Sequence, residues 1–207
     1  ARHILVEKLG EFDDAILEKY VAGQDVSVAE IKDALRRATI AIKVIPIFCG
    51  SAFKNKGVQM LLDAVCDYLP SPLDMPPVEG ANPETKEREK ITRKCDDADP
   101  LSALAFKIMS DQHGDLTYMR VYSGILKSGE NYTNPRKDKR EKVTHLYRMH
   151  ANKREKVVEL GAGEICAVVG FKDVVTGDTI CDEKNPIVLE PPTFAQTVVS
   201  MALEPKL

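Results

Sequence analysis

The spacing of apolar residues changes once along this 207-residue chain, and that change constrains the fold more than any other feature. Before about residue 70, apolar residues recur at three-to-four spacing, which predicts amphipathic helices. After about residue 100 they alternate with polar residues, which predicts half-buried strands. Prolines punctuate the segment between these parts: Pro70, Pro72, Pro76, Pro77, Pro83 and Pro100. The sequence therefore predicts two structural parts joined by a linker.

The first part is expected to be mainly helical. Helical spacing covers about residues 4–20, 28–41 and 58–69. The run Ser27-Val28-Ala29-Glu30 has the form of a capping box, which fixes the start of the second helix. Residues 43–49 form a β-rich run between helices and predict one strand. We expect this strand to be poorly ordered or paired with another chain, because its sheet neighbours are missing here.

The second part is expected to be an antiparallel closed β-barrel. Its short alternating runs are separated by glycines and contain no helical pattern, which is typical of small barrels. Val143, His145 and Tyr147 fall on one face of an expected strand, so we expect His145 to be packed. The predicted domains are residues 1–72, a charged proline-rich linker over 73–99, and the barrel over 100–207.

Composition excludes several classes of protein. Hydrophobic residues make up 43% and charged residues 29%, as in ordinary globular proteins, and no apolar run approaches the ~20 residues that cross a bilayer. The five cysteines show no C-x-x-C spacing, so neither a disulfide framework nor a metal site is expected. These features favour a cytoplasmic protein that does not enter a membrane.

Positive charge gathers in one segment of an otherwise acidic chain. Residues 120–156 hold eleven Lys and Arg against four Asp and Glu, while the whole chain has a net charge of −3. The candidate contact residues are Arg136, Lys137, Lys139, Arg140, Arg148, Lys153 and Arg154. Such a cluster predicts a surface that faces a polyanion, and the alternative is a solvated charged face.

Several segments resemble translational GTPases, and some of them resemble elongation factor G specifically. The general resemblance lies in RVYSGILKSG (120–129), GAGEICAV (161–168) and TGDTI (176–180). The specific resemblance lies in ATIA (38–41), CGSAFKNKGV (49–58), DYLPSP (67–72), LAFKIM (104–109), MHANKRE (149–155) and LEPK (203–206). These segments occur in one order over nearly the whole chain.

The resemblance implies a helical and α/β remnant of a P-loop GTPase domain, followed by a barrel of the translation-factor second-domain type. It implies a role in a ribosomal translocase that binds GTP or GDP with Mg²⁺. Ser51 and Ala52 would form the last guanine-contacting loop of the intact parent, whereas without the resemblance Ser51 would be taken as a helix cap. The implied partners are small-subunit ribosomal RNA and the GTPase domain of the same protein, with no membrane and no DNA.

The chain on its own is not expected to be an enzyme. It has no G-x-x-x-x-G-K-[ST] loop, and Asn55-Lys56-Gly57-Val58 lacks the carboxylate of an N-K-x-D motif. We therefore expect neither GTP hydrolysis nor a bound nucleotide. The basic residues are expected to contact ribosomal RNA through its backbone and shape, because no aromatic residues interleave them in the sequence.

Three alternatives stay open. The first is a related translational GTPase that serves recycling, release or ribosome protection, against which the 149–155 segment argues. The second is a stand-alone RNA-binding β-barrel, against which the Ser51-Ala52 loop argues. The third is an enzyme in its own right, for which no nucleophile, metal cluster or phosphate loop speaks. The start at Ala1 leads us to expect a piece of a longer protein.

Overall fold

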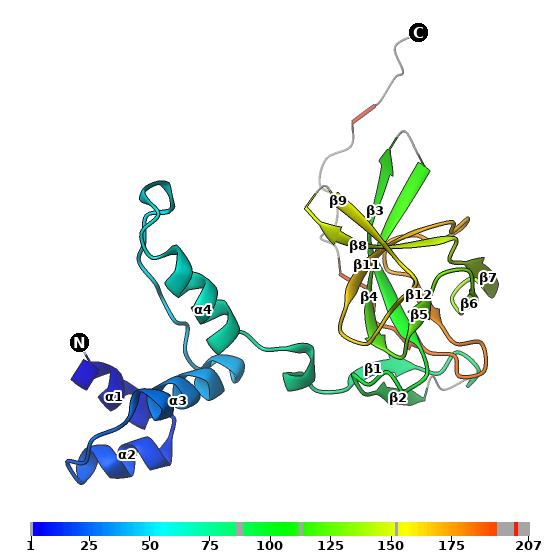
Figure 1. Cartoon of the computed structure of the whole chain (residues 1–207). Helices are drawn as coiled ribbons and strands as arrows, with labels where there is room; N and C mark the ends of the chain where they lie inside the picture. The colour runs from blue at the N-terminus through cyan, green and yellow to red at the C-terminus, as the bar shows by residue number, and fades with distance from the viewer. Residues whose placement is uncertain (1, 86–88, 112–113, 152, 194–200, 203–207) are drawn as a thin grey trace. The chain divides into compact units, whose positions relative to one another are not determined.

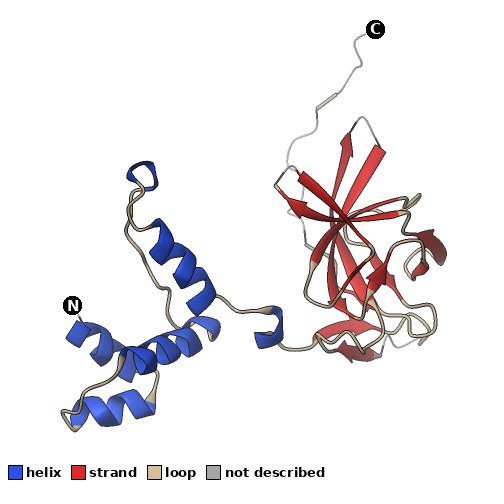
Figure 2. Cartoon of the chain, viewed as in Figure 1, coloured by secondary structure: helices blue, strands red, loops and turns tan. Residues whose placement is uncertain are grey.

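The change of apolar spacing coincides with a division of the chain into two units, shown in a computed structural model (Figure 1). The structure describes all residues except 1, 86–88, 112–113, 152, 194–200 and 203–207. Unit 1 is Ala1–Met75 and unit 2 is Pro76–Leu207. Helices make up the regular structure of unit 1 and strands that of unit 2 (Figure 2). No helix in the described part of the chain has the length and apolar character needed to span a membrane.

Unit 1 forms where the sequence predicts helices. Its helices are α1 (Arg2–Gly10), α2 (Asp14–Val21), α3 (Val28–Ile40) and α4 (Val58–Tyr68), with short 3-10 helices at Ala52–Lys54 and Pro72–Asp74. The predicted capping box is present, because Ser27 Oγ accepts from the Glu30 amide at 3.3 Å and Glu30 Oε2 accepts from the Ser27 amide at 2.9 Å. Leu9, Ile16 and Leu35 form the centre of its hydrophobic core.

Residues 43–49, which we expected to be a strand without its sheet neighbours, form no strand among the described residues. The segment is extended but belongs to no ladder among the described residues. Ile45 and Ile47 are 81% and 86% exposed. A strand exists only where a second strand accepts and donates its backbone hydrogen bonds, and unit 1 offers no such neighbour in the described part.

Unit 2 is built from thirteen strands among the described residues. They are β1 (Val78–Ala81), β2 (Lys90–Arg93), β3 (Ser102–Asp111), β4 (Gly114–Ser123), β5 (Leu126–Lys127), β6 (Asn131–Asn134), β7 (Lys139–Lys142), β8 (His145–His150), β9 (Lys153–Val157), β10 (Glu159–Leu160), β11 (Ile165–Val169), β12 (Thr179–Cys181) and β13 (Val188–Leu189). The main sheet has the order β7-β6-β12-β3-β4-β11-β8-β9, and β10 pairs with β5. All paired strands are antiparallel.

One hydrophobic core fills the inside of this β-barrel-type fold, as the sequence predicted. Met119, Val121, Leu146 and Ile180 have no exposed surface and come from three different strands, β4, β8 and β12. Alternate residues therefore face inward, where their burial supplies most of the stabilisation.

The alternation between residues 143 and 150 differs from the expectation. Val143 and Leu146 are both fully buried, whereas His145 and Tyr147 are only partly buried. β7 ends at Lys142 and β8 begins at His145, so the link between the two strands resets the alternation. His145 and Tyr147 consequently lie on the outer face of the sheet, opposite to Leu146.

The proline-rich segment is not the linker that we expected over 73–99. β1 pairs with both β2 and β13, which makes a small three-stranded sheet within unit 2. Val78 and Ile91 pack against a second core cluster around Leu104 and Ile187. Two four-residue strands, β1 and β2, lie within this segment despite its prolines and charges, because they pair with each other and β1 also pairs with β13.

Candidate nucleic-acid interface

The first basic site is the hairpin formed by β6 and β7. Arg136, Lys137, Lys139 and Arg140 lie in its turn and on β7. All four are matched by acidic residues of the same unit: Arg136 Nη1 lies 3.9 Å and Lys137 Nζ 3.4 Å from the carboxylate of Asp178, Lys139 pairs with Asp173, and Arg140 pairs with Glu183. The hydrogen bond between Lys139 and Asp173 raises the pKa of the lysine and lowers that of the aspartate.

Buried carboxylates attach this hairpin to the loop at 172–178. Asp178 is fully buried and accepts from Asn134 Nδ2 at 2.8 Å and from the Val175 amide at 3.0 Å. Glu141 is only 2% exposed and accepts from the amides of Lys172 and Asp173 at 2.9 and 3.1 Å. These contacts give the acidic partners of the first basic site a structural role.

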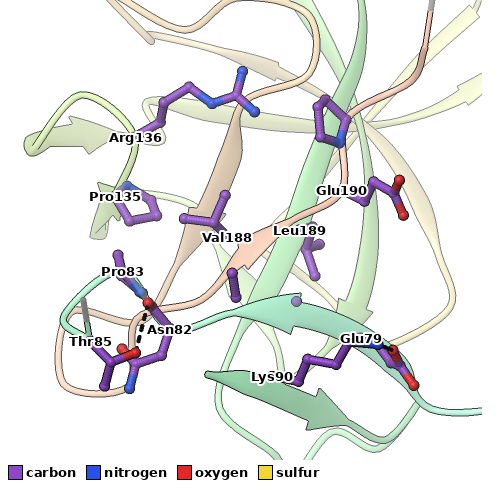
Figure 3. A pocket seen from close by; sticks show the side chains of 13 residues that line it. Glu79, Asn82, Pro83, Thr85, Lys90, Pro135, Arg136, Val188, Leu189 and Glu190 are labelled. Carbon is purple, nitrogen blue, oxygen red and sulfur yellow. Dashed lines mark hydrogen bonds and ion pairs between the residues drawn. The ribbon is translucent and has the colours of Figure 1, made fainter. Parts of the chain in front are cut away.

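An open groove of about 820 Å³ lies beside this hairpin in unit 2 (Figure 3). Val188 and Leu189 of β13, together with Pro83 and Pro135, supply apolar lining, and the Arg136 side chain extends over one side. Glu79 and Lys90 at its rim are paired at 3.1 Å. Because its lysine and arginine both have carboxylate partners, the groove does not concentrate positive charge as a phosphate site requires.

The second basic site is the hairpin formed by β8 and β9. Lys153, Arg154 and Lys156 are exposed on β9, which is the last strand in the order of the main sheet. In the part of the chain that the structure describes, neither lysine lies within ion-pair distance of a carboxylate. Arg148 differs, because its Nη2 pairs with Glu164 Oε1 at 2.5 Å.

The seven predicted contact residues thus separate into two groups. β7 and β9 are at opposite ends of the strand order, and the two hairpins lie on different sides of unit 2 (Figure 1). The acidic partners Asp173, Asp178 and Glu183 were not predicted from the sequence. Their only signal in the sequence was the position of Asp178 within the TGDTI segment.

The Ser51-Ala52 loop is a tight turn before α4 in unit 1. The Ser51 amide donates to the Lys56 carbonyl at 2.9 Å, and the Lys56 amide donates back at 3.0 Å. Ser51 makes no side-chain capping bond, so the alternative role of a helix cap is not what the structure contains. A Cβ on Gly50 would lie 2.8 Å from the Lys56 carbonyl oxygen, which explains a glycine at that position.

Comparison with known proteins shows what the two units are similar to. Residues 114–181, which run from β4 to β12, match the family described as elongation factor Tu domain 2. This segment is therefore similar to domain 2 of elongation factor Tu. Over 205 residues and 99% of its length, the chain is 53% identical to elongation factor G 2 of Syntrophus aciditrophicus strain SB. The resemblance to elongation factor G predicted from the sequence is therefore confirmed.

The coverage of this relative and a structural match limit what these similarities show. The chain spans 30% of the length of this curated relative. Its fold is similar to a crystal structure of a protein from Thermus thermophilus, with a TM-score of 0.63 and 24% sequence identity over 87% of this chain and 24% of that one. At this identity the match supports the fold: helices together with a β-barrel-type unit.

Proposed function

We propose that the chain is part of a cytoplasmic ribosomal translocase of the elongation factor G type, which hydrolyses GTP during protein synthesis. The observation that carries this proposal is the 53% identity to elongation factor G 2 over 99% of the chain. The match of residues 114–181 to elongation factor Tu domain 2 supports it independently, because that domain type occurs within translation factors.

The exposed apolar surface of unit 1 supports a place in a larger GTPase domain. Leu61, Leu62 and Val65 of α4 are 52%, 62% and 45% exposed, and Ile45 and Ile47 are exposed in the segment that precedes this helix. Apolar side chains in this density are expected to be covered. In the proposed function, the GTPase domain of the same protein covers them, and residues 43–49 become a strand of its sheet.

This arrangement gives the Ser51-Ala52 loop its proposed role. The loop would contact the guanine base, and the groups that hold the phosphates of GTP or GDP and the Mg²⁺ ion would come from elsewhere in the parent protein. The chain itself supplies no phosphate loop, and we propose that on its own it neither binds nor hydrolyses the nucleotide.

Unit 2 is proposed to dock on small-subunit ribosomal RNA through the β8–β9 hairpin. Lys153 and Lys156 are exposed and have no carboxylate within ion-pair distance in the described part of the chain, so their charge is available to phosphates. The residues Arg136, Lys137, Lys139 and Arg140 already neutralise buried and surface acids, so they contribute less. Arg148 is paired with Glu164. Arg154 is a further exposed cationic residue of β9.

Sedimentation of the chain with purified small ribosomal subunits tests this proposal. Lys153→Glu with Lys156→Glu should weaken binding at least about tenfold, and it should lower the slope of log affinity against log salt by about 0.7–0.9 for each lost phosphate contact. Lys142→Glu, an exposed lysine of β7, is the matched control and should leave binding within about twofold. Equal binding of the double variant and the parent chain would refute RNA docking by this hairpin.

A further inference from the structure

One cross-strand row on the outer face of the main sheet joins residues that are far apart in sequence. Lys107 of β3 is opposite Tyr118 of β4, and Tyr118 is opposite Ala167 of β11. Ala167 is in turn opposite Tyr147 of β8, which is opposite Lys156 of β9. We call this set, Lys107–Tyr118–Ala167–Tyr147–Lys156, the tyrosine row.

The row faces away from the core. Its immediate chain neighbours Met119, Cys166 and Leu146 are fully buried, and successive side chains of a strand point to opposite faces. Ala167 has no exposed surface although it lies on the outer face, so larger neighbours cover it. The result is a sheet surface on which two phenol rings flank a small residue, about 10 Å apart by strand spacing.

The chemistry of the row combines aromatic rings with unneutralised cations. Lys107 Nζ lies 5.9 Å from the centroid of the Tyr118 ring, and the ring of Phe106, displaced outward at a bulge, lies 6.4 Å from it. Within the residues that the structure describes, Lys107 and Lys156 have no carboxylate within ion-pair distance. One position along the ladder, Arg120 stacks over Tyr122 at 5.1 Å, and its Nε is buried without a hydrogen-bond partner among the described residues.

We propose that the tyrosine row binds unpaired nucleotides of an RNA strand. Base rings stack on Tyr118 and Tyr147, and the flanking phosphates lie at Lys107 and Lys156. Charge complementarity favours RNA as the occupant. The row ends in Lys107 on one side and Lys156 on the other, and neither lysine has a carboxylate partner in the described part of the chain. Aromatic rings on a sheet surface suit stacking of bases without regard to their sequence.

This inference rests on the proposed function and makes it more specific. Lys156 belongs both to the tyrosine row and to the β8–β9 hairpin, so a strand that follows the hairpin backbone would pass directly onto the row. The hairpin by itself would accept any phosphate backbone, whereas the row distinguishes unpaired bases from a duplex, whose bases are already stacked on one another.

Fluorescence anisotropy of the 207-residue chain with a labelled, unstructured single-stranded RNA of about twelve nucleotides tests the row. Tyr118→Ala and Tyr147→Ala should each weaken binding about tenfold, within the range measured for loss of one stacked base. The matched variants Tyr118→Phe and Tyr147→Phe keep the ring and should stay within about twofold. The same RNA annealed to its complement should bind with an affinity that none of the four variants changes.

A second measurement covers the case that the alanine variants misfold, which circular dichroism would reveal. Photo-crosslinking of the unmutated chain to RNA that carries iodinated uridine should join it to Tyr118 or Tyr147, identified by mass spectrometry. Crosslinks confined to other residues would overturn the proposal, as would alanine variants that are folded and bind single strands normally.

The outcomes separate this inference from the proposed function. If Lys153→Glu with Lys156→Glu weakens ribosome binding while the tyrosine variants bind single strands normally, RNA docking stands and the row is refuted. If folded alanine variants bind RNA normally but associate less well with ribosomal subunits, the face contacts a protein, and the proposal is likewise overturned.

Discussion

Asn134 donates a 2.8 Å hydrogen bond from its Nδ2 to Asp178 Oδ2, and both side chains are fully buried. The two residues are 44 positions apart, and their contact joins the end of β6 to the loop that precedes β12. Arg136 and Lys137 approach the same carboxylate from the hairpin turn. The Asp178 carboxylate therefore holds the first basic site together, and its role there is structural.

Asp178→Ala should destabilise unit 2 strongly. The change leaves Asn134 buried without a partner and removes the counter-charge of Arg136 and Lys137, for which about 3 kcal/mol is expected. Guanidinium chloride unfolding followed by circular dichroism measures the loss. Asp138→Asn in the same hairpin is the control and should stay within about 0.5 kcal/mol, because asparagine accepts the positive φ of 51° found there. A similar stability for both variants would contradict the buried pairing.

Gly124→Ala should destabilise unit 2 through a backbone clash. Gly124 has a φ of +71°, and a Cβ there would lie 2.7 Å from the Asp99 carbonyl oxygen and from the Leu101 backbone. Gly129 has a φ of +88°, but a Cβ there would meet nothing within 4 Å, so Gly129→Ala isolates the cost of φ alone. We expect about 1–2 kcal/mol for Gly129→Ala and at least about 3 kcal/mol for Gly124→Ala. Thermal unfolding of both variants compares them, and equal losses would show that the close approach is unimportant.

The helical unit should lose stability in acid through Glu30. Hydrogen bonds from Lys19 and Ser27 lower the pKa of Glu30 from 4.5 to about 2 in the folded chain. A lowered folded pKa contributes stability above the unfolded value, and this contribution disappears as the pH falls from about 4.5 through about 2. Glu30→Gln should therefore be less stable than the unmodified chain at about pH 7, and the difference should vanish near pH 2.

Urea unfolding of unit 1 at several pH values measures this difference. Ser27→Ala, which removes the other half of the capping box, should cost about 1 kcal/mol near neutral pH. A stability gap between Glu30→Gln and the unmodified chain that is the same in neutral and in strongly acidic solution would argue against the charge-dependent contact.

Arg36 should control the C-terminal end of α4. Its Nη1 donates to the carbonyls of Asp67 and Leu69 at 3.0 and 3.2 Å, and its Nη2 donates to Asp74 Oδ2 at 2.6 Å. Arg36→Lys should not replace these contacts, because an ammonium lacks the planar fork of a guanidinium. We expect a loss of about 1–2 kcal/mol for either Arg36→Ala or Arg36→Lys.

Hydrogen exchange of the amides in residues 66–74 reports the change locally. Exchange there should accelerate in the Arg36 variants, while the exposed Lys43→Ala serves as a control with unchanged rates. Full protection of the amides of residues 66–74 in Arg36→Ala would contradict a stabilising role for the Arg36 hydrogen bonds.

The sequence by itself determined the elements whose causes are local. The 3.6-residue period and the box at Ser27 and Glu30 predicted α3 within one residue, because both signals act within one or two turns of helix. The two-residue period and the turn glycines predicted strands at β3, β4 and β8, and the matching segments predicted the resemblance to elongation factor G.

Only the tertiary structure decided the features that depend on distant partners. Residues 43–49 have a strand-like sequence but pair with no strand in the described part of the chain. β1 and β2 form within a charged segment because they pair with each other and β1 also pairs with β13. The basic residues form one cluster in the sequence, but in the fold they lie on two separate hairpins. The basic residues of the β6–β7 hairpin are paired with acidic residues. The tyrosine row likewise exists only in the register of five strands, since cross-strand neighbours are set by pairing and not by position along the chain.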